Sequence, residues 1–396
     1  MSRAAGEPRG GGVVPFTILV TAIMVAGTLP QFAVGALGPL LVDDFDLSRA
    51  QFGTLTTATF TVAAVLSLFV GAVTEKLRPR GTYSALFLAS ALTFAGMSLA
   101  TTYPVLLAFV ALAGVGQALV NPLSNRLIAQ RVRPERQGLV TGIKQSGVHI
   151  GGVVGGVSFP LLAVLLGWRG ALAGAAVLFV VACLATVRLI PQAHVGGGKA
   201  TEAYAGMVAS SVRALAAYAF MMGSGYSSVI TYLPLYAHEA VGVSTALAGT
   251  LLSAMGVIGV TSRIATGHAA DRARNLTLIL AMLALSASGA MLLVLLAASI
   301  HPLLLLLGAL LVGSSAGWNT VVMITVVKRA GRQGIGKASG HVMSGFFAGF
   351  IFSPVIFGFV VDVTGGYTVS WAMFSSLLFA TSVAVWVWDR RSGTGP

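Results

Sequence analysis

The second half of this chain repeats the glycine pattern of the first half at an offset of 198 residues. Gly138, Gly142, Ser146, Gly147 and Gly151 return as Gly336, Gly340, Ser344, Gly345 and Gly349. The chain has 396 residues, so the offset is half its length. Self-similarity at a fixed period is the signature of a fold built from repeated units. We therefore expect two halves of the same architecture.

The composition predicts that both halves lie in a lipid bilayer. Hydrophobic residues make up 56% of the chain and charged residues 9%, whereas soluble domains carry about 25% charged residues. The net charge of +13 would indicate a nucleic-acid partner only if the basic residues shared one face. They lie instead in short loops between apolar runs, so we expect no nucleic-acid partner.

Twelve apolar runs are long enough to cross a membrane, which takes about 20 helical residues for roughly 30 Å of hydrocarbon. They lie near residues 14–38, 50–73, 82–101, 104–128, 138–165, 170–190, 212–237, 244–267, 276–299, 302–327, 337–361 and 367–388. Lipid offers no partner to an open sheet edge, and the runs lack the alternation of barrel strands. The first run is longer than a signal-peptide core, so we interpret it as a permanent span. The expected fold class is an all-α integral membrane protein of twelve transmembrane helices.

The expected domains are two pseudo-symmetric six-helix bundles, residues 14–190 and 212–388. A flexible linker, residues 191–211, joins them, and residues 1–13 and 389–396 are the tails. Of the 24 Lys and Arg residues, 19 fall in the tails and the even-to-odd connections, whereas Arg49 and Arg169 fall in the opposite loops. The positive-inside rule then places both termini in the cytoplasm. We expect a multi-pass protein of the bacterial cytoplasmic (inner) membrane.

Two loops of the chain resemble a known family signature. After the eighth span the chain reads Gly267-His268-Ala269-Ala270-Asp271-Arg272, and after the second span it reads Gly71-Ala72-Val73-Thr74-Glu75-Lys76. Both resemble the signature loop of the major facilitator superfamily, a Gly followed four positions later by an acidic and then a basic residue. The first copy departs from that pattern, with Glu75 for the usual Asp and Arg78 where a Gly is expected. Tyr232-Leu233-Pro234-Leu235-Tyr236 and Gly167-Trp168-Arg169 are also common in the family.

This resemblance covers all twelve spans and implies a monomeric secondary active transporter, a symporter or antiporter that works by alternating access. In the family the acidic group of the loop binds a neighbouring helix start, where a carboxylate gains roughly 0.3–1 kcal/mol. The predicted gating residues are Gly71, Glu75, Lys76, Arg263, Gly267, Asp271 and Arg272. The sequence shows no metal-ligand spacing, nucleophile–base set or phosphate-binding loop, so we expect no enzyme, no metal and no cofactor.

The resemblance also implies a substrate site near the midplane, lined by spans 1, 4, 7 and 10. Span 4 carries Gln117, Asn121 and Asn125 at i, i+4 and i+8, a polar stripe on an apolar helix. The 198-residue offset places Asn319 at the position of Asn121. The predicted substrate-binding residues are Gln31, Gln117, Asn121, Asn125, Lys144, Gln145, Tyr226, Thr231, Trp318 and Asn319. The alternative for each is a helix–helix hydrogen bond, which contributes about 0.6 kcal/mol.

Three basic residues lie inside spans, where insertion scales assign Lys or Arg a cost of about 2.5–3.5 kcal/mol. Arg126 and Arg263 lie within about a turn of the cytoplasmic ends, so we expect both to extend to the headgroups. Lys144 lies about six residues into span 5, roughly 9 Å deep. We interpret it either as a counter-charge for the substrate or as another cation whose side chain extends to the headgroups. His149 and His341 are candidate proton-coupling groups, with packing against Ser or backbone as the alternative.

No Asp or Glu lies deep in a span, which disfavours export of lipophilic cations. The expected function is transport of a small organic solute, anionic or strongly polar, coupled to protons. The alternative is a proton-driven exporter of drugs or secondary metabolites that uses Tyr226 and Trp318. A transporter-like sensor would need a cytoplasmic signalling segment that the sequence does not show. The expected partners are the small-molecule substrate, the lipid bilayer and protons.

Overall fold

The computed structural model describes residues 13–76, 79–189, 209–273 and 275–391, and within these ranges it is helical apart from short connections. The first half contains α1 (Val13–Ala36), α2 (Gly38–Phe45), α3 (Arg49–Lys76), α4 (Pro79–Leu99), α5 (Tyr103–Arg131) and α6 (Pro134–Leu189). The second half contains α7 (Ala209–Glu239), α8 (Thr245–Arg272), α9 (Leu276–Leu296), α10 (Leu303–Ser315), α11 (Trp318–Thr364) and α12 (Thr368–Arg391). Most of the expected linker, residues 191–208, and most of the two tails lie outside the described residues.

These helices form the twelve expected spans, although helices and spans do not correspond one to one. The short α2 is an addition, α6 comprises spans 5 and 6, and α10 with α11 comprises spans 10 and 11. Nine helical stretches of the described residues are long and apolar enough to cross a membrane, and the stretch within α6 has 47 residues, enough for two crossings. The expected twelve-helix fold class is therefore confirmed.

Two reversals explain the long helices. Gly167 interrupts α6 with φ 71° and ψ 160°, a conformation that glycine adopts without a Cβ clash. In α11 the rings of Trp318 and Phe346 lie 6.0 Å apart, although 28 residues separate them. A straight helix would place those residues about 42 Å apart, so the chain reverses between them. Each long helix is therefore a pair of neighbouring spans.

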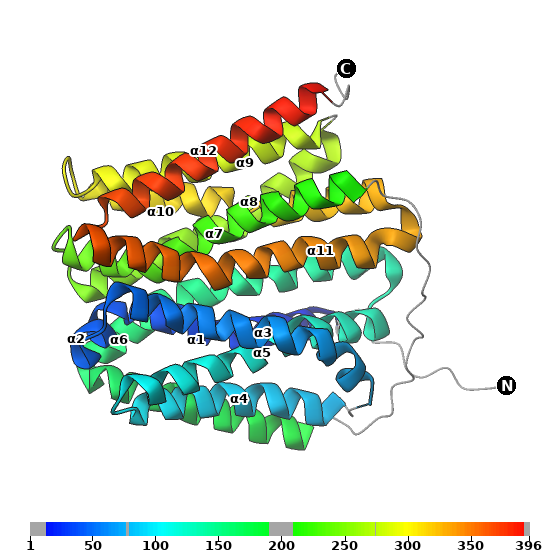
Figure 1. Ribbon diagram of the computed structural model, residues 1–396. Helices are drawn as coiled ribbons and strands as arrows, with labels where there is room; N and C mark the ends of the chain where they lie inside the picture. Colours follow the sequence, from blue (N-terminus) through cyan, green and yellow to red (C-terminus); the bar gives the residue numbers. More distant parts are fainter. Residues whose placement is uncertain (1–12, 77–78, 190–208, 274, 392–396) are drawn as a thin grey trace.

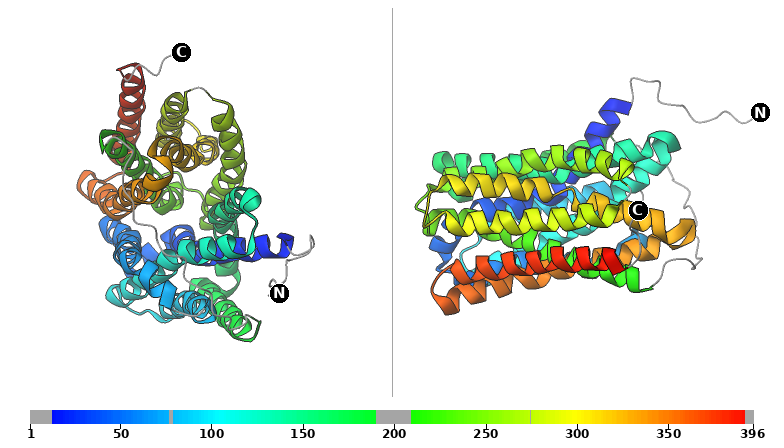
Figure 2. Two further views of the ribbon diagram at one scale, coloured as in Figure 1. Left: turned by 90° about the vertical axis from the view of Figure 1, so that its right-hand side faces the viewer. Right: turned by 90° about the horizontal axis from the view of Figure 1, so that it is seen from above.

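The two halves lie side by side with their long axes roughly parallel (Figure 1). The start of α1 and the end of α12 lie at one end of the bundle, which we call the terminal end; the opposite end, with α2, is the far end (Figures 1 and 2). Between the halves, α3 packs on α11 and α6 packs on α8. These two pairs of helices hold the halves together.

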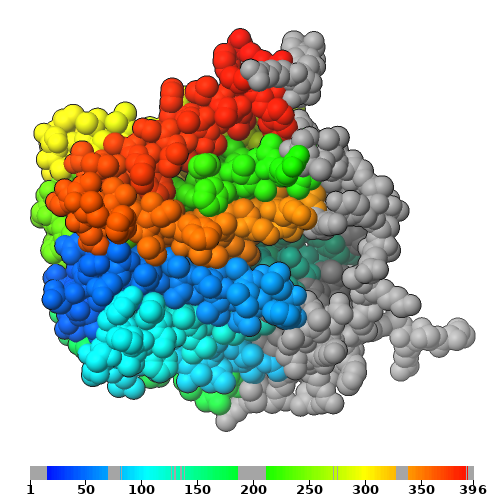
Figure 3. Space-filling view, in the orientation of Figure 1, coloured from blue at the N-terminus to red at the C-terminus, as the bar shows by residue number. Residues whose placement is uncertain are grey.

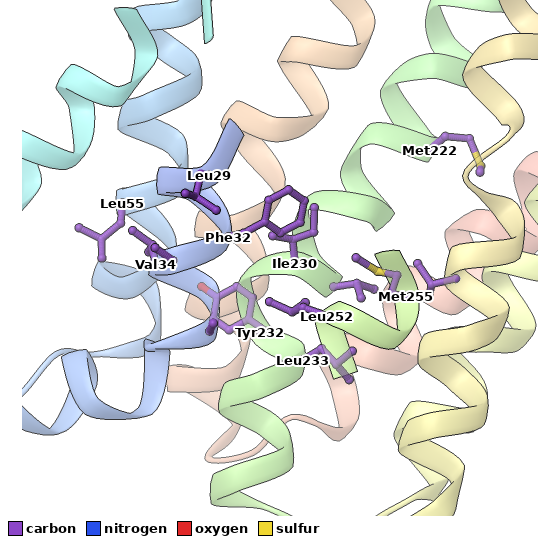
Figure 4. Packing of buried hydrophobic residues seen from close by; sticks show 14 of the residues in the cluster. Leu29, Phe32, Val34, Leu55, Met222, Ile230, Tyr232, Leu233, Leu252 and Met255 are labelled. Atoms are coloured by element: carbon purple, nitrogen blue, oxygen red, sulfur yellow. The ribbon is translucent and has the colours of Figure 1, made fainter. Parts of the chain in front are cut away.

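Small residues allow the halves to approach closely. A Cβ atom on Gly156 of α6 would lie 2.5 Å from the carbonyl oxygen of Gly249 in α8, so the two backbones are in direct contact there. Ser253 Oγ donates to the Val153 carbonyl at 2.8 Å across the same pair of helices. Close backbone packing of this kind is how helices associate in lipid, where apolar burial gives no net driving force. Figure 4 shows apolar side chains of α1, α3, α7 and α8, with Phe32 of the first half beside Ile230 of the second.

Replacing Gly358 by Ala is expected to weaken the closure of the far end. The new Cβ would overlap the Arg49 carbonyl oxygen of the opposite half, and overpacking of this kind costs about 1–3 kcal/mol. Thr56, whose Oγ1 lies 3.0 Å from Thr231 Oγ1 of the other half, is a buried position for a reporter cysteine. Cys183 is the single cysteine of the chain and is first replaced by Ser. In this background, Thr56→Cys should react with a soluble maleimide roughly 5- to 150-fold faster in the Gly358→Ala variant.

The matched control is Gly366→Ala, because a Cβ atom at Gly366 would have no neighbour within 4 Å. Gly366→Ala should leave the labelling rate of the reporter unchanged. Equal rates in the two glycine variants would contradict a role of Gly358 in closure.

Candidate functional site

Polar side chains from both halves meet in the middle of the molecule. They are Asn121 and Asn125 of α5, Lys144, Gln145 and His149 of α6, Tyr226 of α7 and Arg263 of α8, and we call them the cationic cluster. The i, i+4 spacing of the two asparagines places both amides on the side of α5 that faces α6. The cluster thus joins the first half to the second.

Lys144 is held inside the first half by amide oxygens. Its side chain is 0% exposed, and Nζ donates to Asn121 Oδ1 at 3.1 Å and to Asn125 Oδ1 at 2.8 Å. Gln145 Nε2 donates to the same Asn121 oxygen at 3.5 Å. The ammonium group therefore points into the protein rather than towards the headgroups.

Arg263 crosses from the second half to the first. Its Nε donates to His149 Nε2 at 2.9 Å and its Nη1 to the Gln145 carbonyl at 3.3 Å. Tyr226 Oη lies 3.2 Å from His149 Nδ1. α8 can come this close because residue 259 is a glycine. A Cβ atom at this position would lie only 2.5 Å from His149 Nδ1. Our expectation that Arg263 extends to the headgroups is wrong, because α8 continues to Arg272 and the acceptors lie between the halves.

No carboxylate among the described residues pairs with either Lys144 or Arg263. The ion pairs of the described residues are Arg49–Glu239 at 2.9 Å and Arg169–Asp44 at 2.8 Å, both at the far end. Two cations in a low-dielectric region without counter-charges are costly. An anion that entered the cluster would remove that cost.

A second polar network joins the halves at the far end. Asp362 of α11 accepts from the first backbone N–H groups of α3, those of Arg49 and Ala50, both at 2.8 Å. Tyr367 Oη donates to Glu239 Oε2 at 2.6 Å, and Tyr232 Oη lies 2.7 Å from the Arg49 and Pro354 carbonyl oxygens. We call Arg49, Tyr232, Glu239, Asp362 and Tyr367 the far-end network.

The far-end network borders a hollow of about 950 Å³, so it is accessible to the solution. Burial and the nearby Glu239 carboxylate raise the pKa of the Tyr367 phenol. The raised pKa favours the protonated phenol, which is the form that donates to Glu239.

The halves are closed at the far end and diverge towards the terminal end. Among hydrogen bonds between described residues, the contact between halves nearest the terminal end is the one from Arg263 to Gln145. On the other side of the molecule, the Phe60 and Phe347 rings meet at 6.2 Å. In Figure 3, α3 and α11 touch near the far end and separate towards the terminal end, where part of α6 is visible between them.

The family model of the Major Facilitator Superfamily matches residues 19–340. The chain belongs to this superfamily. It is therefore a multi-pass membrane transporter, not an enzyme, and a small molecule is its substrate.

Individual relatives differ in the substrates that their names give. The nitrite extrusion protein of Bacillus subtilis (strain 168) is 24% identical over 385 residues, 94% of each chain. The chloramphenicol resistance protein of Streptomyces lividans is 28% identical over 193 residues, so the match spans 49% of this chain and 48% of that protein. A bacterial homolog of the human lysosomal transporter Spinster, in an inward-facing and occupied conformation, has a TM-score of 0.77 at 15% identity, over 97% of this chain and 98% of its own.

Several residues predicted for the substrate site of this transporter lie in other contacts. Gln117 Nε2 donates to Gln31 Oε1 at 3.4 Å, one helical turn from Asn121, so this pair extends the cluster along α5. Thr231 bonds Thr56 in the buried contact between halves. Trp318 packs between the rings of Tyr218 and Phe346.

Two further predictions for the site concern α11. Asn319, next to Trp318, is partly buried, and its side-chain amide makes no hydrogen bond within the described part of the chain. His341 is exposed, and none of the contacts of the cationic cluster involves it. Of the two histidines predicted to couple protons, His149 alone lies in the cluster.

Most residues of the predicted signature loops cannot be placed in contacts. The side chains of Gly71, Glu75, Lys76, Asp271 and Arg126 lie outside those that the structure describes. The second signature segment, predicted as a loop, is the last part of α8. A Cβ atom at Gly267 would lie 3.8 Å from Thr320 of α11, so this part of α8 lies close to that helix. Arg272 is exposed. The gating roles of the signature-segment residues stay predictions, as does the extension of Arg126 to the headgroups.

The far-end network and the inward direction of Arg263 are the features that sequence reasoning missed. A signal for the network was present, because Arg49 is one of two basic residues in the loops that otherwise lack them. Both exceptions, Arg49 and Arg169, have carboxylate partners in the structure.

Proposed function

We propose that this transporter carries a small monovalent anion between its two halves, with Lys144 and Arg263 as the counter-charges. The observation that carries the proposal is that two cations in the cationic cluster lack a carboxylate partner among the described residues. A guanidinium group forms paired hydrogen bonds with a planar oxyanion, and an ammonium group adds a compact charge. The full-length similarity to a protein named for nitrite extrusion supports an oxyanion of that size.

Alternating access would act on the cluster from both sides. We place both termini in the cytoplasm, because the positive-inside rule applies to the connections at the terminal end. The described state, closed at the far end, is then inward-facing. Rocking of the halves about the cluster would open the far-end network and expose Lys144 and Arg263 to the other side. In this proposal the protein works as a monomer in a bacterial cytoplasmic membrane.

Export of a neutral drug is a second candidate. It is favoured by the similarity of half the chain to a chloramphenicol resistance protein. An uncharged drug would leave both cations of the cluster uncompensated, and this is why we place the anion first.

The test is thermal stabilisation of the purified protein by candidate substrates. Nitrite, nitrate, formate, chloramphenicol and tetraphenylphosphonium are compared at constant ionic strength, made up with gluconate. A ligand at about 100 times its dissociation constant should add roughly 2.7 kcal/mol to the free energy of unfolding. We expect stabilisation by one or more of the three anions, and the same stabilisation in Arg213→Gln, which removes an exposed charge of α7. Stabilisation by chloramphenicol alone would favour the exporter.

A further inference from the structure

The contacts of His149 define where its proton lies. Arg263 Nε carries a hydrogen and can only donate, so His149 Nε2, 2.9 Å away, must accept with its lone pair. The neutral imidazole then carries its hydrogen on Nδ1, which faces Tyr226 Oη at 3.2 Å. In this state His149 has no room for a proton on Nε2, because Arg263 occupies that position.

The groups around His149 leave Nε2 as the position where a proton can enter. The histidine is 1% exposed. Among the side chains that the structure describes, the charged or titratable groups nearest to it are Arg263 of α8, Tyr226 of α7 and, five residues earlier on its own helix, Lys144. Two other helices pack on α6 near this level: α1 supplies Phe32 and Thr28, and α5 supplies the amides of the cluster. Within the described residues no carboxylate competes for the proton.

Anion binding would change this arrangement. An anion in the cluster attracts the guanidinium of Arg263, and the hydrogen bond from Arg263 Nε to His149 Nε2 breaks. The freed lone pair then takes a proton from water at the open terminal end and forms an N–H bond. Lys144 and Arg263 give the empty cluster a charge of +2, and an anion together with a proton leaves that charge at +2. The negative charge of the anion favours the added proton, and the proton in turn favours the anion, because opposite charges attract strongly in a low-dielectric site.

We infer that His149 is the proton-binding residue of the transport cycle, and that one proton binds together with each anion, which makes the protein a proton–anion symporter. This inference rests on the proposed anion transport. Because linkage is reciprocal, the anion must bind more tightly as the proton becomes more available. In the pH range where His149 is unprotonated in the empty site and protonated in the anion-bound site, the affinity for the anion should rise tenfold for each pH unit of acidification.

The experiment measures nitrate binding by calorimetry on the full-length protein from pH 6 to pH 8.5, and it is repeated in two buffers of different ionisation enthalpy. Nitrate does not itself titrate in this range, so the buffer dependence counts the protons taken up by the protein. We expect about one proton per nitrate in the wild type. His149→Gln should still bind nitrate, with an affinity that no longer depends on pH. His341→Gln removes an exposed histidine and should keep the wild-type proton uptake.

A pH-independent affinity in the wild type would overturn the inference, and this result requires no variant. Proton uptake that persists in His149→Gln and disappears in Lys144→Gln would overturn it too, because Lys144 would then be the titrating group. If the protein binds neither nitrate nor any other small anion, the proposed function fails, and the inference fails with it. Nitrate binding without proton uptake overturns the inference alone and leaves the proposed function standing.

Discussion

Replacing Lys144 by Gln is expected to abolish anion transport and to weaken anion binding by roughly 10- to 150-fold. That range corresponds to about 1.5–3 kcal/mol, the usual contribution of a hydrogen bond to a charged group. Gln keeps N–H donors that can satisfy Asn121 and Asn125, whose oxygens now bind Nζ. The loss would therefore report the missing charge rather than an unsatisfied amide. The measurements are anion uptake into proteoliposomes and the dissociation constant of the purified protein.

The stability of the unliganded Lys144→Gln variant separates a binding defect from misfolding. Removing a buried cation that has no carboxylate partner among the described residues is expected to leave the melting temperature unchanged or to raise it. A variant that melts at or above the wild-type temperature and transports nothing supports the counter-charge. Arg213→Gln on α7 removes an exposed charge and should transport normally. Unchanged affinity for every transported anion in Lys144→Gln would exclude Lys144 from the site.

The transmembrane architecture follows from sequence because lipid leaves few alternatives. A run of about 20 apolar residues must be helical to satisfy its backbone in a bilayer. The break at Gly167 also falls where the sequence separates spans 5 and 6. These features depend on local properties of the chain, and a single sequence records them.

The direction of Arg263 depends instead on a contact between distant segments. Its position near the end of span 8 is compatible with extension towards the headgroups. The direction of its side chain is set by the close approach of α8 to α6. Gly256 and Gly259 permit this approach, because a Cβ atom at either position would clash with His149. No local pattern around Arg263 encodes the identity of that partner.

The internal repeat predicts the backbone of the second half better than its chemistry. Asn319 corresponds to Asn121, but the position that corresponds to Lys144 is Val342, and the position that corresponds to His149 is Phe347. The second half therefore has no cation at this level of α11 to bind the Asn319 amide. Phe347 packs against Phe60 instead. The corresponding positions therefore form a polar site in the first half and an aromatic contact in the second.

Replacing Asp362 by Asn is expected to open the far end. The carboxylate accepts from the first two N–H groups of α3, at Arg49 and Ala50, where the helix dipole and hydrogen bonds to a charged group together favour the closed form by about 1–2 kcal/mol. The Thr56→Cys reporter in the Cys183→Ser background should then react roughly 5- to 30-fold faster.

A second ion pair at the same end provides the control. Arg169 and Asp44 bond at 2.8 Å, but both belong to the first half, so their contact does not change when the halves separate. Asp44→Asn should therefore leave the labelling rate at Thr56→Cys unchanged, although it removes the same charge as Asp362→Asn. If both variants accelerate labelling equally, the effect is general loosening of the far end and the far-end network does not hold the halves together. If Asp362→Asn alone does so, closure depends on a carboxylate of one half at the helix start of the other.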